Sequence, residues 1–446
     1  MAPRVGVVRA RALTGVFAPP GDKSITHRAV LFGLLADGVT EVRGANAGED
    51  CASSCSAAAA LGATVVRASD GWDVTGTGGR LRASPSPIQC GNSGTTLRLL
   101  AGIVAGQPFS TTLIGDASLS RRPMRRIAEP LARMGASVHG QGDAATPPLT
   151  IDGAELNGIA YEVPMASAQV ATCTLLAGLQ ARGSTQVTLP GPARDHTERM
   201  LPAFGAAVER TELPHGGREV RVVGGTRLRA ANVHVPGDFS AAAFFLAAAA
   251  ADPGARVTAR GVNLNPTRTG FLDVLRAMGA VVEIEHEHES AGEPVGDVTV
   301  TGPEYLKSFT VPAEWLPRMV DEAPAWAVVA AAARGVSRLT GASELRVKES
   351  DRIASIAAGL HAVGIVADAT ADTLAVTGGV PHGGARIATH HDHRIAMAFA
   401  VLASRMSEPL WFDDLSSVPT SYPAFFATLT DLGGGLVPEA AAGESR

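Results

Sequence analysis

Residues that could bind anions gather in residues 20–28 (PGDKSITHR). A Gly-Asp turn here leads into a predicted helix with Lys23, His27 and Arg28 on its opening turns. Backbone N–H groups and the positive end of the helix dipole favour a phosphate or a carboxylate at such a start. We expect Ser24 to be the N-cap. The segment predicts an anion site, and a capped surface helix with incidental cations is the alternative.

A second group of ionisable residues lies in the C-terminal half. Residues 345–352 (LRVKESDR) hold five charges, and residues 391–394 (HDHR) and Asp321-Glu322 each open a further predicted helix. Carboxylates surrounded by cations are candidates for general acid and general base catalysis. Salt bridges at helix ends are the simpler explanation for single members of the group, namely Arg346, Asp351 and Asp392. They explain less well why charges gather at several helix starts.

Lysine is rare in this chain, so its positions are informative. Of 38 lysines and arginines, only Lys23, Lys307 and Lys348 are lysine. An ammonium can shift its pKa and transfer a proton, which a guanidinium cannot do. Because Lys23 and Lys348 both fall in the charged segments, we favour a functional role for them over chance.

Four further segments carry groups suited to anions. Gly94 in GNSGTT lets an anion approach the backbone, and Arg122 in RRPMRR precedes Pro123, which we expect to fix a helix start. Residues 167–169 (SAQ) place small hydrogen-bonding groups at another helix start, and Arg194 in RDHT could bind a phosphate bidentately. Each segment alone could equally be an ordinary loop or a solvated helix face.

A repeat of roughly seventy residues organises these segments. Each repeat opens with a small polar turn and an Ala/Leu-rich run, beginning near Gly21, Gly91, Ala166, Gly237, Asp321 and Asp392. A second helix follows, and we expect it to end at a glycine C-cap: Gly62, Gly135, Gly205, Gly279, Gly364 and Gly433. Short β-branched stretches lie between the helices. The repeating unit is therefore predicted as strand, helix, strand, helix, strands.

The fourth repeat copies the first, since PGDFS at residues 236–240 echoes PGDKS at residues 20–24. We therefore predict two similar α/β domains of three repeats each, residues 20–234 and residues 1–19 with 235–446. Phe239 stands where the first copy has Lys23. The shared residues then indicate turn and capping chemistry, and Lys23 needs a functional explanation.

Composition narrows the class of protein. The 446 residues are 46% hydrophobic with a net charge of −5, so the chain is globular and a nucleic-acid-binding surface is not expected. Four cysteines without metal-finger spacing indicate buried thiols of a reducing compartment. No signal peptide is recognisable, and the longest apolar run, residues 241–251, is about half of a membrane span. We expect a cytoplasmic protein that does not bind membranes.

Two histidine groups raise the question of a metal. His286 and His288 alternate on one face of an exposed strand, and His390, His391 and His393 lie beside Arg394. Neighbouring positive charge disfavours a divalent ion at the second group. We expect no required metal and no cofactor.

Taken together, these segments resemble the 5-enolpyruvylshikimate-3-phosphate synthases, in the bacterial branch often grouped as class II. The matching pieces are PGDKSITHRA, GNSGTTLRL, GDASLSRRPM, SAQ, RDHTE, VDE, LRVKESDRI, HHDHRIAM and SYPAF. The resemblance implies two domains, each of three βαβαββ units, with the active site in the interdomain cleft. It implies transfer of the enolpyruvyl group of phosphoenolpyruvate to the 5-hydroxyl of shikimate 3-phosphate, with release of phosphate, as in aromatic amino-acid biosynthesis.

The resemblance also implies roles for matching residues. The expected shikimate 3-phosphate ligands are Lys23, Ser24, Arg28, Ser167, Ala168, Gln169, Arg194, Asp321 and Lys348. The expected phosphoenolpyruvate ligands are Lys23, Gly94, Arg122, Gln169, Arg352 and Arg394. Asp321 is expected to be the base at the hydroxyl, and Glu349 with Lys23 the acid/base pair at the methylene carbon. We expect a monomer.

Two departures from the family pattern stand out. Thr26 replaces the usual serine, and the stretch Thr420-Ser421-Tyr422-Pro423 lacks the lysine that many relatives carry there. Gly94 keeps the phosphoenolpyruvate pocket wide, so glyphosate is expected to inhibit competitively.

Two alternatives stay open from the sequence. An enolpyruvyl transferase of the UDP-N-acetylglucosamine type shares the architecture but would want a reactive cysteine within residues 115–123, where this chain has none. A non-catalytic module that binds anions or RNA ends would not need Asp321, Lys348 and Glu349 together.

Overall fold

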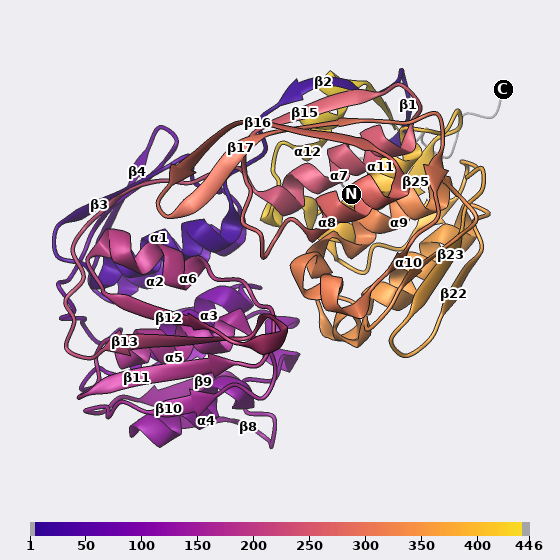
Figure 1. Cartoon of the computed structure of the whole chain (residues 1–446). Coiled ribbons are helices and arrows are strands. Elements are labelled where there is room, and N and C mark those ends of the chain that lie inside the picture. The colour runs from indigo at the N-terminus through magenta and orange to yellow at the C-terminus, as the bar shows by residue number, and fades with distance from the viewer. Residues whose placement is uncertain (1–4, 439–446) are drawn as a thin grey trace. The chain divides into compact units, whose positions relative to one another are not determined.

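The computed structural model describes residues 5–438, which form two compact units (Figure 1). The N-terminal unit consists of Pro20–Pro236 and the short segment Glu289–Pro294. The C-terminal unit holds the described residues before Pro20, Gly237–His288 and the described residues from Val295 onward. The sequence predicts a boundary at residue 235 and gives no sign that Glu289–Pro294 returns to the N-terminal unit.

Each repeat of the N-terminal unit is a four-stranded sheet with two helices. The first repeat contains β14 (Asn232–His234), α1 (Lys23–Leu35), β3 (Val39–Arg43), α2 (Glu49–Ala60), β4 (Thr64–Ala68) and β5 (Gly71–Thr75). The second contains β6 (Ile88–Gln89), α3 (Gly94–Val104), β7 (Ser110–Ile114), α4 (Arg125–Met134), β8 (Ser137–Gln141) and β9 (Thr146–Asp152). The third contains β10 (Ala160–Glu162), α5 (Ala168–Gly178), β11 (Ser184–Leu189), α6 (His196–Met200), β12 (Val208–Glu212) and β13 (Arg218–Val223).

The C-terminal unit has three repeats of the same kind. The first contains β2 (Thr14–Phe17), α7 (Phe239–Ala251), β15 (Arg256–Asn263), α8 (Gly270–Met278), β16 (Val281–Ser290) and β17 (Glu293–Thr301). The second contains β19 (Thr310–Val311), α9 (Ala323–Ala332), β21 (Val336–Leu339), α10 (Arg352–Ala362), β22 (Ala367–Ala369) and β23 (Leu374–Thr377). The third contains β24 (Arg386–Ile387), α11 (His393–Ala403), β25 (Leu410–Phe412), α12 (Phe425–Leu432), β26 (Gly434–Pro438) and β1 (Val5–Arg9).

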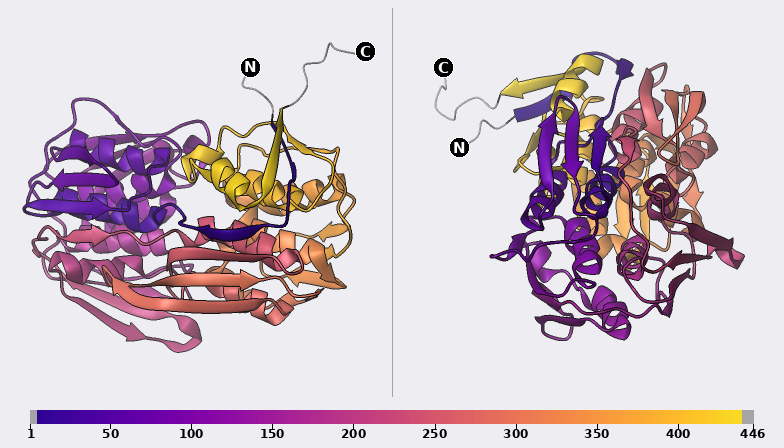
Figure 2. Two further views of the ribbon diagram at one scale, coloured as in Figure 1. Left: turned by 90° about the horizontal axis from the view of Figure 1, so that it is seen from above. Right: turned by 90° about the vertical axis from the view of Figure 1, so that its left-hand side faces the viewer.

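All six four-stranded sheets share one topology, which confirms the predicted repeat. A separate two-stranded sheet pairs β18 (Leu306–Lys307) with β20 (Ala333–Arg334). The first strand pairs in parallel with the second, as β6 does with β7, and the fourth strand lies between the second and the third. In the last sheet the fourth strand is β1, which pairs antiparallel with both β25 and β26 (Figure 2). The strand nearest the start of the chain therefore completes the last repeat.

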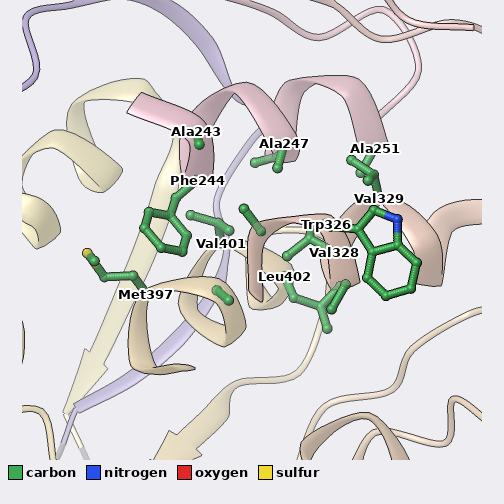
Figure 3. Close-up of a cluster of buried hydrophobic side chains, with 14 of the residues drawn as sticks. Ala243, Phe244, Ala247, Ala251, Trp326, Val328, Val329, Met397, Val401 and Leu402 are labelled. Atoms are coloured by element: carbon green, nitrogen blue, oxygen red, sulfur yellow. The ribbon is translucent and has the colours of Figure 1, made fainter. Parts of the chain in front are cut away.

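The first helix of each repeat forms the interior of its unit. In the C-terminal unit α7, α9 and α11 contact one another, and every residue of α7 is buried. Figure 3 shows Phe244 of α7, Trp326 of α9 and Met397 of α11 in this core. A helix that is apolar on all sides is expected to be buried in this way. Because the sides of such a helix are buried, only residues at its ends can contact a substrate. The candidate residues lie at helix N-termini.

The sequence predicts the C-terminal ends of the helices correctly but misplaces the N-terminal end of α1. All six predicted C-cap glycines have positive φ, from 79° at Gly364 to 129° at Gly433, and are confirmed. Ser24 is not the N-cap of α1, because the helix already begins at Lys23, two residues before the start that a Ser24 cap would give. The Asp22 carboxylate caps it by accepting a hydrogen bond from Ile25 N at 3.0 Å. Asp238 caps α7 in the same way.

Within residues 5–438, no helix combines the length and apolar character needed to cross a membrane.

Candidate active site

Lys23 lies at the first position of α1 and forms an ion pair with Asp50. Asp50 is in the first turn of α2, so two helix N-termini meet at this pair. Asp50 is absent from the sequence-predicted site. The sequence does show Glu49-Asp50 as an acidic pair at a helix start. Acidic residues are common there because they interact favourably with the helix dipole, so the pair alone does not indicate a site. Only the packing of α1 against α2 shows that Asp50 faces Lys23.

Arg28 is buried one turn further along α1 and joins three helices. Its Nε donates to Thr197 Oγ1 of α6 at 2.8 Å, and an Nη donates to Thr172 Oγ1 of α5 at 3.1 Å. Burial lowers the pKa of Arg28 to about 10, although Glu198, Asp22 and Glu293 counteract it. The guanidinium therefore stays charged at neutral pH inside an almost closed site.

Gly94 begins α3 beside two arginines. A Cβ added there would lie 2.8 Å from Arg98 Nη1 and 3.3 Å from Arg122 Nη1. Arg122 donates to Asn92 Oδ1 at 2.7 Å, and Arg98 donates to Gln169 Oε1 at 2.6 Å. The structure thus brings Gly94, Arg122 and Gln169 together and adds Arg98 to the predicted set. Arg98 lies within an apolar stretch of α3, and the sequence alone does not predict which neighbours its side chain contacts.

Pro123 does not start a helix, which corrects the sequence prediction. Arg122 ends a 3₁₀ turn (Leu119–Arg121), and α4 begins only at Arg125, after Pro123 and Met124. The extended conformation of Arg122, with ψ of 135°, interrupts the helical turns on either side. Asn92 then holds the Arg122 guanidinium beside Gly94.

Ser167, Ala168 and Arg194 lie at the starts of the third repeat's helices. Ser167 is the N-cap of α5 but makes no capping hydrogen bond through its side chain, and Ala168 is the first residue of the helix. Arg194 precedes α6, and its carbonyl oxygen accepts from the buried Arg218 at 2.9 Å. Ser24 contributes its carbonyl oxygen to Arg28 at 3.0 Å. These predicted site residues therefore lie at three helix starts of the N-terminal unit.

A buried chain of hydroxyls ties the helix starts of the N-terminal unit together. His27 Nδ1 lies 2.8 Å from Ser54 Oγ of α2, and Ser54 Oγ lies 2.8 Å from Thr96 Oγ1 of α3. Thr96 Oγ1 in turn donates to Ser93 Oγ, the cap of α3, at 2.8 Å. Burial lowers the pKa of His27 to about 3, so the ring is neutral at physiological pH and adds no charge beside Lys23.

In the C-terminal unit, Arg352 is the centre of a carboxylate cluster. Its buried guanidinium contacts Asp392 at 2.9 Å, Glu349 at 2.6 Å and Asp321 at 3.4 Å. Burial opposes its charge, but these three carboxylates raise the pKa of Arg352 above its ordinary value. Burial likewise works against ionisation of Asp392, yet Arg352 keeps the pKa of Asp392 below its ordinary value. Charged segments that are 28 to 71 residues apart in the sequence thus meet at one guanidinium.

Asp321 and Glu349 differ in their remaining contacts. Arg394 donates to the Asp321 carbonyl oxygen at 3.2 Å and lies 3.8 Å from its carboxylate. Glu349 lines an open cavity of about 380 Å³ with Ser350, Asp351 and His390. Asp321 is therefore enclosed by two arginines, whereas Glu349 faces accessible space.

Glu322, the neighbour of Asp321, is anchored in the interior. Ser240 of α7 donates to Glu322 Oε1, and Arg268 donates to Ser240 Oγ at 2.8 Å. Arg268 also pairs with the cap Asp238 at 3.2 Å. The buried network fixes the 3₁₀ turn η5 (Val320–Glu322), and with it the backbone of Asp321.

Lys348 is not brought into the Arg352 cluster. It forms an ion pair with Glu344, four residues earlier. Arg346 and Asp351 pair with each other at 2.6 Å, as the simpler explanation of their charges predicts. Of the five charges in LRVKESDR, the structure therefore assigns Glu349 and Arg352 to the cluster.

One histidine of each group lies beside a carboxylate. His286 lies 3.1 Å from Asp297, and His391 lies 2.8 Å from Asp414. No group of three or more metal-ligating side chains occurs among residues 5–438.

Comparisons with known proteins identify the family of the chain. The profile of the EPSP synthase (3-phosphoshikimate 1-carboxyvinyltransferase) family matches residues 7–429. A curated 3-phosphoshikimate 1-carboxyvinyltransferase from Alkalilimnicola ehrlichii is 47% identical, over 98% of this chain and 97% of its own length. One from Methylorubrum populi is 48% identical, over 96% of both chains.

Solved structures extend the comparison. The EPSP synthase from Acinetobacter baumannii has a TM-score of 0.87 and 41% identity, covering 98% of this chain and all of that one. The enolpyruvyl transferase NikO from Streptomyces tendae has a TM-score of 0.74 at 17% identity, over 98% of this chain and 99% of its own, and so shares the fold. The family profile, the full-length identity and the shared fold lead to one conclusion: the chain belongs to the EPSP synthase (3-phosphoshikimate 1-carboxyvinyltransferase) family.

Proposed function

We propose that the clusters of both units serve one reaction, in which the enolpyruvyl group of phosphoenolpyruvate moves to the 5-hydroxyl of shikimate 3-phosphate and phosphate leaves. The chain is a transferase of the shikimate pathway by family. Individual residues of this chain have substrate-binding and acid/base roles in the proposed reaction.

The proposal assigns one set of residues to each substrate. Shikimate 3-phosphate is assigned to Lys23, Ser24, Arg28, Ser167, Ala168, Gln169, Arg194, Asp321 and Lys348. Phosphoenolpyruvate is assigned to Lys23, Gly94, Arg122, Gln169, Arg352 and Arg394. Each phosphate carries about −1.5 to −2 and each substrate adds a carboxylate, so roughly −5 to −6 must be neutralised. The two sets together supply seven cations. Four of these also lie beside carboxylates of the chain: Lys23, Lys348, Arg352 and Arg394.

The observation that carries the chemical proposal is the meeting of Asp321 and Glu349 at Arg352. Asp321 removes the proton of the 5-hydroxyl as its oxygen attacks the C2 carbon of phosphoenolpyruvate. Glu349, with Lys23, delivers a proton to the methylene carbon, which becomes a methyl group. In the second step that methyl group returns a proton, the C–O bond to phosphate breaks, and the enolpyruvyl double bond forms again.

The test is release of inorganic phosphate with both substrates, compared with either substrate alone. General acid and base groups typically contribute about 10²–10⁴-fold. Asp321→Asn and Glu349→Gln should therefore lower kcat by that order while the dissociation constants of both substrates change far less. Normal turnover in either purified variant would remove that residue from the mechanism.

The cysteine-dependent alternative finds no support in the thiols. All four cysteines are buried, and burial raises the pKa of Cys55, Cys90 and Cys173 to about 12. None of them lies within residues 115–123. Their thiols are protonated and inert, so we assign no nucleophilic cysteine.

Glyphosate is proposed as a competitor of phosphoenolpyruvate. Gly94 leaves the space beside Arg98 and Arg122 free of a side chain. Inhibition should be relieved by added phosphoenolpyruvate, and absence of inhibition at millimolar glyphosate would refute this part of the proposal.

A further inference from the structure

The tip of the β16–β17 hairpin is part of the N-terminal unit. The rest of the hairpin belongs to the C-terminal unit, but Glu289–Pro294 packs with residues of Pro20–Pro236 (Figure 1). The chain thus leaves the C-terminal unit at residue 289 and returns to it at residue 295.

Three contacts show that this tip is docked in a fitted position. Ser290 Oγ donates to the carbonyl oxygen of His234 at 2.7 Å, and Ala291 packs against the apolar core of the N-terminal unit. Gly292 has φ of +80°, and a Cβ there would lie 2.3 Å from the Arg199 carbonyl oxygen. Only glycine fits this close approach to the C-terminal turn of α6.

The fourth contact reaches the phosphate-binding segment. Glu293 Oε1 lies 2.7 Å from His196 Nδ1, and both side chains are fully buried. His196 is the first residue of α6 and lies between Arg194 and Thr197, the hydroxyl of which accepts from Arg28. Glu293 also acts on the charge of Arg28, whose pKa it raises while Arg194 lowers it. Glu293 therefore contacts the segment that holds Arg194 and acts on the charge of Arg28.

We propose that Glu293 is a positioning residue for shikimate 3-phosphate binding. It holds His196 and balances the charge of Arg28, and so keeps residues 194–197 in the conformation that binds the substrate. The inference rests on the proposed role of Arg194. A buried acceptor that fixes a binding segment acts by preorganisation, because the segment does not have to be ordered when the ligand arrives.

The experiment measures the dissociation constant of shikimate 3-phosphate by titration calorimetry, without phosphoenolpyruvate, for Glu293→Ala. We expect an increase of about tenfold, since small displacements of binding groups have effects of this order or larger. Glu293→Gln keeps an oxygen that can accept from His196 and should recover part of the affinity. Glu289→Ala, at the exposed end of the same tip, is the matched control and should bind normally.

Steady-state kinetics separate positioning from general destabilisation. In Glu293→Ala the KM for shikimate 3-phosphate should rise about tenfold while the KM for phosphoenolpyruvate stays within about twofold. A variant that is only less stable would lose active enzyme, and hence apparent kcat, with neither KM changed. If Glu293→Ala does not fold, Gly292→Ala disturbs the same docking without removing the carboxylate, and it should weaken shikimate 3-phosphate binding in the same direction.

Arg194→Ala separates this inference from the proposed function. If Arg194→Ala weakens shikimate 3-phosphate binding and Glu293→Ala does not, the function of Arg194 stands and the inference is wrong. If neither variant changes the dissociation constant, both are wrong. If both weaken binding, the double variant should lose less than the product of the two single effects, because both act on one segment.

Discussion

Mild acid should destabilise the N-terminal unit through His27. The ring is fully buried, and its pKa falls from 6.5 to about 3 on folding. A group with a lowered pKa in the folded state favours folding above its unfolded pKa, and this contribution is lost as the pH falls. Between pH 6.5 and 3 the unfolded chain binds a proton at His27 that the folded chain does not bind. Stability should therefore decrease across this interval.

The size of the effect follows from the same shift. From about pH 7.5 to about pH 5, the folded histidine stays neutral while the unfolded one becomes almost fully charged, which costs about 2 kcal/mol. Replacing His27 with asparagine removes the titrating group and leaves an amide near the Nδ1 position, within reach of Ser54. The variant should lose about 2 kcal/mol less than the unchanged protein over this interval, although it starts from a lower stability at neutral pH.

The assay is equilibrium unfolding in urea at both pH values, with the change in free energy compared between the two proteins. Other groups also titrate over this interval. The contribution of His27 is therefore the pH-induced change in the free energy of unfolding of the unchanged protein minus that of the variant. Identical acid sensitivity in His27→Asn and the unchanged protein would refute the assignment of a buried neutral histidine.

Three further predictions follow from single contacts. Gly94→Ala should raise the KM for phosphoenolpyruvate and weaken glyphosate inhibition, because its Cβ would lie 2.8 Å from Arg98 Nη1; an unchanged KM in steady-state assays would contradict this. Asp22→Ala should lower the free energy of unfolding in urea by about 1 kcal/mol through loss of the α1 cap, and an unaltered midpoint would argue against the cap. Asp392→Asn should cost about 3–5 kcal/mol, since it removes the one fully buried carboxylate that contacts the buried Arg352; a loss below about 1 kcal/mol in the same assay would show that Glu349 and Asp321 suffice.

The repeat and its helix ends could be predicted because their signals are local. A glycine that ends a helix must adopt positive φ, and the six glycines do so wherever the sequence places them. The same locality explains the errors at Ser24 and Pro123. Capping residues and prolines mark a helix start to within one or two residues, and the register is decided by which carboxylate reaches the free N–H groups.

The partners of the charged residues could not be predicted, because they depend on tertiary packing. Asp50 faces Lys23 only because α2 packs against α1, and Glu293 reaches His196 from a hairpin almost one hundred residues away. Lys348 shows the reverse case, since its place in the sequence beside Glu349 suggests a shared cluster, whereas its ammonium pairs with Glu344. Adjacent side chains in an irregular turn need not point in the same direction.

The two copies of the Pro-Gly-Asp motif share a helix cap and differ at the residue that follows it. Asp22 and Asp238 both cap a buried helix, so this part of the motif is structural in each unit. At the next position, Phe239 is fully buried in the apolar core, whereas Lys23 pairs with a carboxylate at another helix start. A cation at the position of Phe239 would have to be desolvated without a partner, and a phenylalanine at the position of Lys23 would leave Asp50 without its cation. The cap is therefore interchangeable between the units, and the residue after it is not.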